Sequence, residues 1–236
     1  VPMKLPISKR LLCCAGLVPA GSRVADIGTD HGYLGIYLLQ NRLSPHVLAC
    51  DLRKGPLENA RKNAALFGVG DDMEFRLSDG LAGISPEELD CAVLAGMGGD
   101  LILRILSQCD WRKKDGLTFV LQPQSAGNVL RRHLCADGFE ILREEPVQDG
   151  SFLYTVMQVC RGTPQMLTPG TEYASPALLK SGSELVGPYL QRVESALTAT
   201  VEGLSNADRQ RPERLSYFSQ ALAEIQEMRK NYADHS

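Results

Sequence analysis

The sequence lacks any arrangement of cysteines that is typical of a disulfide framework or a zinc site. Its seven cysteines are an odd number, none forms a CxxC pair, and none lies in a cluster with histidine at metal-ligand spacing. Disulfide-rich secreted domains carry even sets of cysteines, and structural zinc sites carry closely paired ones. We therefore expect reduced thiols, no metal site and a cytoplasmic protein.

Long apolar runs are also missing. No stretch approaches the roughly 20 apolar residues that a membrane-spanning helix needs, so we expect no membrane partner. Residues 9–20 (KRLLCCAGLVPA) imitate a secretory signal, but Gly16 and Pro19 interrupt the apolar run. This segment predicts a short helix that packs on the domain following it.

An excess of positive charge is absent as well. The chain has 25 Lys and Arg against 28 Asp and Glu, a net charge of −3 and a pI of about 5.9. This balance weakens a nucleic-acid-binding function, although a local basic patch would suffice for one. Two short basic clusters, 112–114 and 131–133, are candidates for phosphate contacts.

What the sequence does have is a regular alternation of strand-like and helix-like segments through its first two-thirds. The predicted strands are 23–27, 46–51, 73–77, 90–95, 117–121, 139–145 and 152–159, and the predicted helices are 33–41, 55–67, 101–107 and 128–136. Five βα units and a closing strand pair indicate an α/β fold, a mostly parallel seven-stranded sheet with an antiparallel edge. In such sheets, ligands bind at the carboxyl ends of the strands.

The pattern changes after residue 160. Residues 161–183 are rich in Pro, Gly and Thr and predict a linker. Within 184–236, two segments carry apolar residues at three- and four-residue steps, with Arg229 interrupting the second. Residues 205–214 between them hold turn and helix-start residues. We therefore predict one domain over 1–160 and a C-terminal, coiled-coil-like helical hairpin over 184–236.

The loop after the first strand departs from the pattern that binds nucleotide diphosphates. It reads Asp26-Ile-Gly28-Thr-Asp30-His-Gly32, whereas a pyrophosphate site reads G-x-G-x-x-G and faces negative charge with backbone N–H groups. Two carboxylates would repel a pyrophosphate, which disfavours a nicotinamide dehydrogenase. They suit S-adenosylmethionine, which carries an ammonium group and a cationic sulfur but no phosphate, while the glycines let the backbone approach it closely.

Acidic residues also follow the next two strands. Asp51 ends the second strand 25 residues after Asp26, where a carboxylate can accept hydrogen bonds from both ribose hydroxyls, and Leu52 follows it as a further cofactor-binding candidate. Asp79 and Gly80 follow the third strand, and Asp79 is placed to accept a hydrogen bond from an adenine amino group. The simpler structural alternative is that these aspartates only cap helices at βα turns.

The turn after the fourth strand, Ala95-Gly96-Met97-Gly98-Gly99, has almost no side chains. It therefore leaves room for a ligand and a substrate. We include Gly96 among the candidate cofactor-binding residues.

Four segments together resemble the bacterial TrmK family: 7–11 (ISKRL), 24–34 (VADIGTDHGYL), 95–99 (AGMGG) and 121–124 (LQPQ). The resemblance implies a Rossmann-like class I methyltransferase fold that uses S-adenosylmethionine and methylates N1 of adenine 22 in tRNA. It covers residues 1–160, and more loosely the hairpin, since that family also carries a coiled-coil-like C-terminal domain.

The residues fit chemistry at adenine N1. The N1 lone pair carries no proton, so its attack on a methyl group needs no general base. Enzymes that methylate the N6 amino group usually show an Asn/Asp-Pro-Pro-aromatic loop after the fourth strand, and this chain has the glycine turn 95–99 there. Catalysis would then consist mainly of alignment and electrostatic support for a cationic product. Because N1 lies on the Watson–Crick edge, the base must be unpaired or flipped out.

Further candidates lie beyond the cofactor loops, in the first loop, the glycine turn, the end of the fifth strand and the N-terminal segment. The catalytic candidates are His31, Met97 and Gln122, and the substrate-binding candidates are Lys9, Arg10 and Gln124. For Lys9 and Arg10, an exposed basic helix face is the structural alternative to phosphate contact.

Two other functions stay open at this point. One is a methyltransferase that acts on another RNA or on a small molecule, and the other is a non-catalytic adaptor that binds S-adenosylmethionine. The sequence does not determine the oligomeric state, and we favour a monomer.

Overall fold

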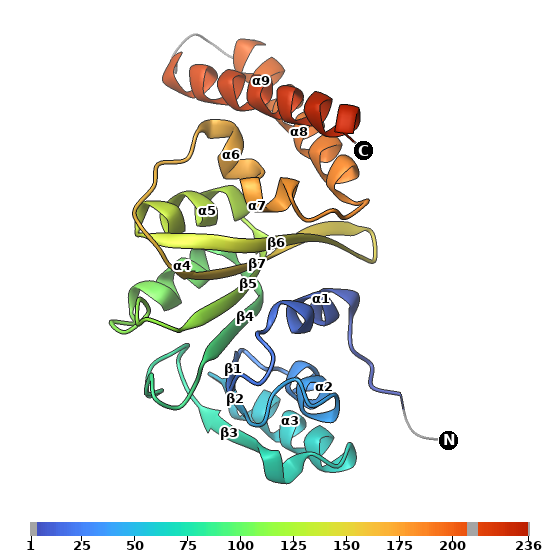
Figure 1. The fold of residues 1–236 in the computed structure, drawn as a ribbon, viewed down its shortest axis with the longest axis vertical. Helices are drawn as coiled ribbons and strands as arrows, with labels where there is room; N and C mark the ends of the chain where they lie inside the picture. Colours follow the sequence, from blue (N-terminus) through green and yellow to red (C-terminus); the bar gives the residue numbers. More distant parts are fainter. Residues whose placement is uncertain (1–3, 207–211, 236) are drawn as a thin grey trace.

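Seven strands form one sheet in the computed structural model, which describes residues 4–206 and 212–235 (Figure 1). The strands are β1 (Val24–Ile27), β2 (Val47–Asp51), β3 (Met73–Leu77), β4 (Cys91–Gly98), β5 (Thr118–Ser125), β6 (Phe139–Asp149) and β7 (Phe152–Arg161). Their order is β3-β2-β1-β4-β5-β7-β6. The first five strands pair in parallel, and β7 pairs antiparallel with β5 and β6. The predicted fold class is confirmed.

The direction of the strand order reverses next to β1, which lies between β2 and β4. Such a reversal opens a crevice at the carboxyl ends of the strands, because the loops leaving β1 and β4 turn to opposite faces of the sheet. The candidate loops of the sequence therefore lie together at the carboxyl ends of the parallel strands.

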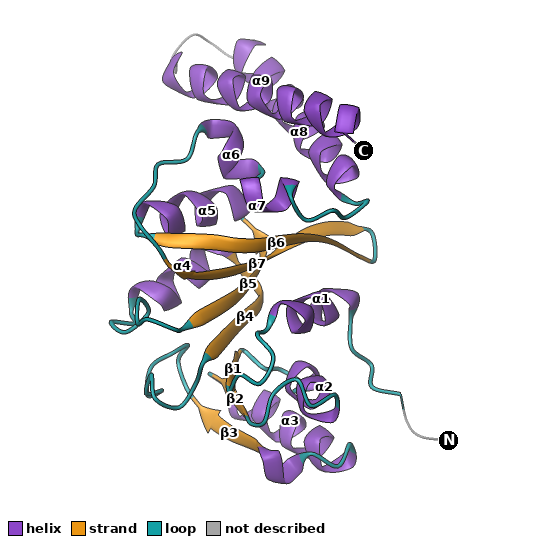
Figure 2. Ribbon diagram, viewed as in Figure 1, coloured by secondary structure: helices purple, strands orange, loops and turns teal. Residues whose placement is uncertain are grey.

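Helices cover both faces of the sheet (Figure 2). On one face lie α1 (Lys9–Leu17), α2 (Tyr33–Gln40) and α3 (Lys54–Leu66), and on the other lie α4 (Gly99–Ser107) and α5 (Gly127–Ala136). Every residue of β1 and β2 is buried, because successive residues point to opposite faces and both faces are covered. The predicted N-terminal helix is α1, which begins at its cap Ser8.

Two long helices follow the sheet, and they pack against each other with a core of their own (Figure 1). They are α8 (Val186–Asn206) and α9 (Pro212–His235). Leu190 and Leu197 of α8 are buried with Ala221 and Ile225 of α9. Residues 207–211, the middle of the predicted turn, lie outside the described residues. Arg229 of α9, which interrupts the apolar pattern, forms an ion pair with Glu194 of α8.

The predicted linker contains two short helices, α6 (Pro169–Tyr173) and α7 (Pro176–Leu179). Each has a hydroxyl N-cap followed by proline, Thr168 before α6 and Ser175 before α7. Leu178 is fully buried in the same core as α8 and α9. This segment is therefore packed structure along part of its length, and the domain boundaries stay a prediction.

A buried ion pair joins the sheet domain to these helices. The guanidinium of Arg131, on α5, donates to the carboxylate of Glu144 on β6, and both side chains are almost inaccessible to solvent. It also donates to Thr155 Oγ1 at 2.9 Å, to the Glu172 carbonyl oxygen at 3.0 Å and to the Tyr189 hydroxyl at 3.3 Å. Because a buried charge needs such partners, this network fixes α5, β6, β7, α6 and α8 relative to one another.

None of the helices within residues 4–206 and 212–235 combines the length and the hydrophobicity of a transmembrane span. In the same residues, no three or more His, Cys, Asp or Glu side chains are grouped so that they could hold a metal ion.

Candidate active site

The site begins with a buried carboxylate near the end of β1. Asp26 is only 4% exposed and accepts a hydrogen bond from Thr29 Oγ1 at 2.7 Å. Burial raises the pKa of Asp26 to about 6, the Thr29 hydrogen bond opposes that rise, and the charge of nearby Asp51 adds to it. Both carboxylates are buried, so little water screens the charge of one from the other. A ligand cation placed beside them would relieve their repulsion.

Backbone conformation shapes the first loop. Gly28 and Gly32 both have φ of 74°, and Asp30 has φ of 52° with an exposed side chain. The Gly28 and Thr29 N–H groups donate to the Cys50 carbonyl oxygen, so they hold the loop against β2. Among the described residues, the N–H groups of Asp30 and His31 have no acceptor. These two amides are therefore the ones in this loop that can bind a ligand anion.

The loops after β2 and β3 place the next acidic residues. Asp51 is buried at the end of β2, and its Oδ1 accepts the Arg53 N–H at 2.9 Å, while Leu52 is 64% exposed. Asp79 is exposed after β3. Gly80 is buried with φ of 59°, and a Cβ there would lie 2.7 Å from Ile105 of α4. Glycine at position 80 is thus explained by the packing of α4.

A buried hydrogen-bond network lies behind the glycine turn. Gln122 on β5 is fully buried, and its Oε1 accepts from Arg10 Nη1 at 2.8 Å and from the Gly96 N–H at 2.9 Å. Its Nε2 donates to the Pro123 carbonyl oxygen. A Cβ on Gly96 would lie 2.8 Å from Arg10 Nη1, and Arg10 Nε is 3.5 Å from Asp149. The Gln122 side chain is thus already hydrogen-bonded within the protein, and its predicted contact with the base edge stays a prediction.

The other candidates are spread over the side of the molecule at the carboxyl ends of the parallel strands. The methyl group of Met97, near the end of β4, would be 2.6 Å from a Cβ on Gly28, so Met97 packs against the loop after β1. The exposed His31 ring stacks on Tyr33 with centroids 5.4 Å apart. Gln124 and Lys9 are exposed, at the end of β5 and on α1 respectively.

Comparison with known proteins identifies the family. The family model of the methyltransferase domain matches residues 7–157. The tRNA (adenine(22)-N(1))-methyltransferase of Bacillus subtilis is 30% identical over 198 residues, which make up 82% of this chain and 79% of that enzyme. This chain belongs to the same methyltransferase family. The resemblance of its motifs to the TrmK family is thereby confirmed.

Solved structures extend this TrmK likeness to nearly the whole chain. A Streptococcus agalactiae protein of the NADB-Rossmann superfamily is 30% identical with a TM-score of 0.82, covering 97% of this chain and 100% of that one. The structure of M. capricolum TrmK in complex with S-adenosyl-homocysteine is 25% identical with a TM-score of 0.73, and the match covers 96% and 98% of the two chains. The C-terminal helices are therefore part of the shared architecture.

The two basic clusters of this TrmK relative are mostly occupied by ion pairs. Arg112 and Lys113 both contact Asp137, and Lys114 contacts Glu87. Arg131 is buried with Glu144, so its predicted phosphate contact is wrong. Sequence spacing gives no sign of this, because the acidic partners of these residues lie 13 to 27 positions away.

Proposed function

We propose that this chain transfers a methyl group from S-adenosylmethionine to N1 of an adenine in tRNA, adenine 22 by analogy with its relatives. One observation carries most of this proposal. Asp26 and Asp51 are both buried near the carboxyl ends of the adjacent strands β1 and β2, where a dinucleotide-binding fold would present an anion site.

The residues fit the cofactor in three ways. The unpaired N–H groups of Asp30 and His31 suit its carboxylate, and the Asp26 carboxylate suits its cationic groups. Asp51 would hold the ribose hydroxyls and Asp79 the adenine amino group. When bound, S-adenosylmethionine supplies an electrophilic methyl group on a positively charged sulfur.

The remaining residues would hold the target base rather than move a proton. The turn 95–99 offers backbone carbonyl groups and the Met97 side chain, and neither is a base for an N–H group. Arg10 is held against this turn by Gln122, and its side chain is partly exposed, so a substrate phosphate would find a cation here. Adenine N1 needs only alignment with the methyl group and sulfur, so this arrangement suffices for N1 and not for N6.

The direct test is methyl transfer from labelled S-adenosylmethionine to unmodified tRNA, followed by nucleoside mass spectrometry. We expect 1-methyladenosine, and we expect no product with a matched tRNA that carries guanine in place of adenine 22. N6-methyladenosine found before any alkaline rearrangement, or methyl groups only on guanosine or cytidine, would overturn the proposal. Cofactor binding without transfer to any tRNA would favour the adaptor function.

A further inference from the structure

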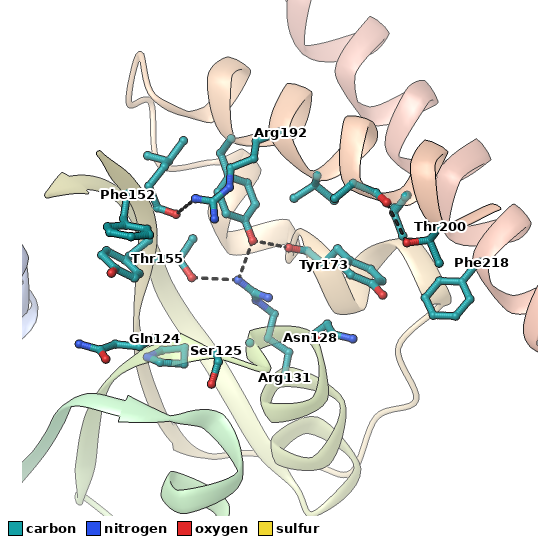
Figure 3. Close-up of a pocket in the computed structure, with 18 residues that line it drawn as sticks. Gln124, Ser125, Asn128, Arg131, Phe152, Thr155, Tyr173, Arg192, Thr200 and Phe218 are labelled. Carbon is teal, nitrogen blue, oxygen red and sulfur yellow. Dashed lines mark hydrogen bonds between the residues drawn. The ribbon is translucent and has the colours of Figure 1, made fainter. Parts of the chain in front are cut away.

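A cavity of about 470 Å³ lies between the sheet and the C-terminal helices, outside the cofactor loops (Figure 3). Its walls come from the end of β5, the start of α5, the β7 strand, α8 and α9. A cavity of this size accommodates a small organic group such as a nucleotide. It adjoins the glycine turn, because Ser125 on its floor pairs in register with Gly98 of β4.

One end of the cavity is an aromatic platform. Phe152 at the start of β7 is 56% exposed, and its ring stacks on Tyr154 with centroids 5.8 Å apart and an interplanar angle of 28°. Phe218 of α9 lies at the opposite end (Figure 3). An aromatic ring this exposed at the mouth of a cavity is a surface on which a flat ligand can stack.

The floor carries polar side chains that have no partner within the protein. Among the described residues, the side chains of Gln124, Ser125 and Asn128 make no hydrogen bond. They lie along one side of the cavity in Figure 3. The two amide groups and the hydroxyl can each donate and accept hydrogen bonds, so they match the edge of a nucleobase, which carries both donors and acceptors.

The charge around the cavity is positive. Its lining contains Arg131 and Arg192 and no Asp or Glu, although the chain as a whole carries a net charge of −3. Arg131 is neutralised by Glu144. Exposed Arg192 donates to the Leu153 carbonyl oxygen at 2.6 Å and forms no ion pair within the described part of the chain. Arg192 therefore presents an uncompensated cation above the aromatic platform.

We infer that this cavity binds one unpaired nucleotide of the RNA substrate, a neighbour of the methylated adenine along the strand. The base stacks on Phe152, its edge meets Gln124 and Ser125 on the floor below that ring, and Arg192 binds a phosphate. The inference rests on the proposed function, because it requires RNA at the glycine turn. The buried Arg131 network holds the surrounding elements in place, so the cavity is formed before the RNA arrives.

The test compares steady-state kinetics of full-length variants on tRNA. Phe152→Ala should raise KM for tRNA by roughly 5- to 100-fold, the range expected for loss of one base–aromatic stack. The kcat at saturating tRNA and the affinity for S-adenosylmethionine should not change. Phe152→Trp should restore KM. Leu142→Ala removes another exposed apolar side chain from the β6–β7 hairpin, outside the cavity lining, and should have no effect.

Arg192→Gln provides an independent measurement. The plot of log binding constant against log salt should become shallower by about 0.7–1, the share of one phosphate contact. Arg42→Gln, in the loop between α2 and β2 at the amino ends of the parallel strands, should leave the slope unchanged. In the wild-type protein, 2-aminopurine at one of the two nucleotides flanking adenine 22 should lose fluorescence on binding, and Phe152→Ala should abolish that loss.

The outcomes separate the two proposals. If wild-type protein methylates no tRNA, the proposed function fails. If it methylates tRNA and Phe152→Ala and Arg192→Gln keep the wild-type KM and salt slope, only the cavity inference fails. A fall in kcat with unchanged KM, or no fluorescence change at either flanking nucleotide, would also overturn the cavity inference.

Discussion

At the scale of single residues, Asp26 destabilises the ligand-free protein. Its folded-state pKa of about 6 lies above the ordinary value of 3.8, so the folded protein retains this proton to higher pH than the unfolded chain does. Stability is therefore lost as pH rises from about 4 to 6, and the full cost, on the order of 3 kcal/mol, is present above that range.

Asp26→Asn should accordingly raise the free energy of unfolding of the ligand-free protein by about 1–3 kcal/mol at pH 7.5. The gain should disappear near pH 4, where the wild-type carboxyl is protonated too. The same variant should bind S-adenosylmethionine more weakly, because the cationic groups lose their counter-charge. Denaturation with and without ligand measures both effects, with exposed Asp71→Asn as the control. Equal stability of Asp26→Asn and wild type at both pH values would contradict this account.

Gln122 is the residue whose role depends most on contacts distant in sequence. Gln122→Leu leaves the Arg10 guanidinium and the Gly96 N–H without their acceptor, which should cost about 1–3 kcal/mol of stability. We expect kcat to fall about tenfold or more because the glycine turn shifts, with little change in cofactor affinity. Gln122→Glu keeps an acceptor for both donors and should recover part of kcat. A change in KM alone would argue for direct base contact instead.

The sequence identified the acidic strand ends because burial and strand position can be read locally. It singles out Gln122 and Gly80 as candidates but does not reveal their contacts. Gln122 acts on Arg10, 112 residues away, and Gly80 is small because Ile105 of α4 packs on it. Such contacts follow from the tertiary packing of elements, which no local pattern encodes.

At the scale of elements, long periodic segments were predicted well and short or irregular ones were not. The helices α6 and α7 have only five and four residues, too few to show a period, although their Ser/Thr-Pro caps were visible. Strands β4 and β5 run on to Gly98 and Ser125, past their predicted ends at 95 and 121. The register of this strand pair shifts between Ala95 and Gly98. Because the pairing is irregular there, the last residues of the two strands show no regular apolar pattern from which they could be predicted.

The Arg131–Glu144 pair makes a prediction about how these elements hold together. Arg131→Met leaves Glu144 buried without its cation, which should cost about 3–5 kcal/mol of stability. The double variant Arg131→Met/Glu144→Leu should recover part of that loss, since it removes the unpaired charge but leaves the Thr155 and Glu172 partners of Arg131 without a hydrogen bond. Denaturant unfolding of the single and double variants measures this. Full stability in the single variant would show that the pair does not join the two parts of the protein.

At the scale of the whole molecule, the glycine turn and the cavity beneath α8 and α9 lie on neighbouring parts of one surface. An RNA strand that reaches the turn therefore also meets the C-terminal helices. This arrangement favours a strand whose bases are already separated, since a stacked duplex presents neither N1 nor an open base to such a surface.

A tRNA in which adenine 22 is locked in a stable Watson–Crick pair should therefore react more slowly than one in which it is unpaired or easily opened. The penalty is the free energy of opening, about a few kcal/mol, so the rate at subsaturating tRNA should fall by roughly 10- to 100-fold. With saturating S-adenosylmethionine, the rate should show no steep rise between pH 6.5 and 9, because N1 has no proton to lose and the site offers no base for it. Single-turnover methylation of matched tRNA variants across this pH range measures both. A strongly alkaline-activated rate, or equal rates on locked and open substrates, would mean that the nucleophile is not an exposed adenine N1.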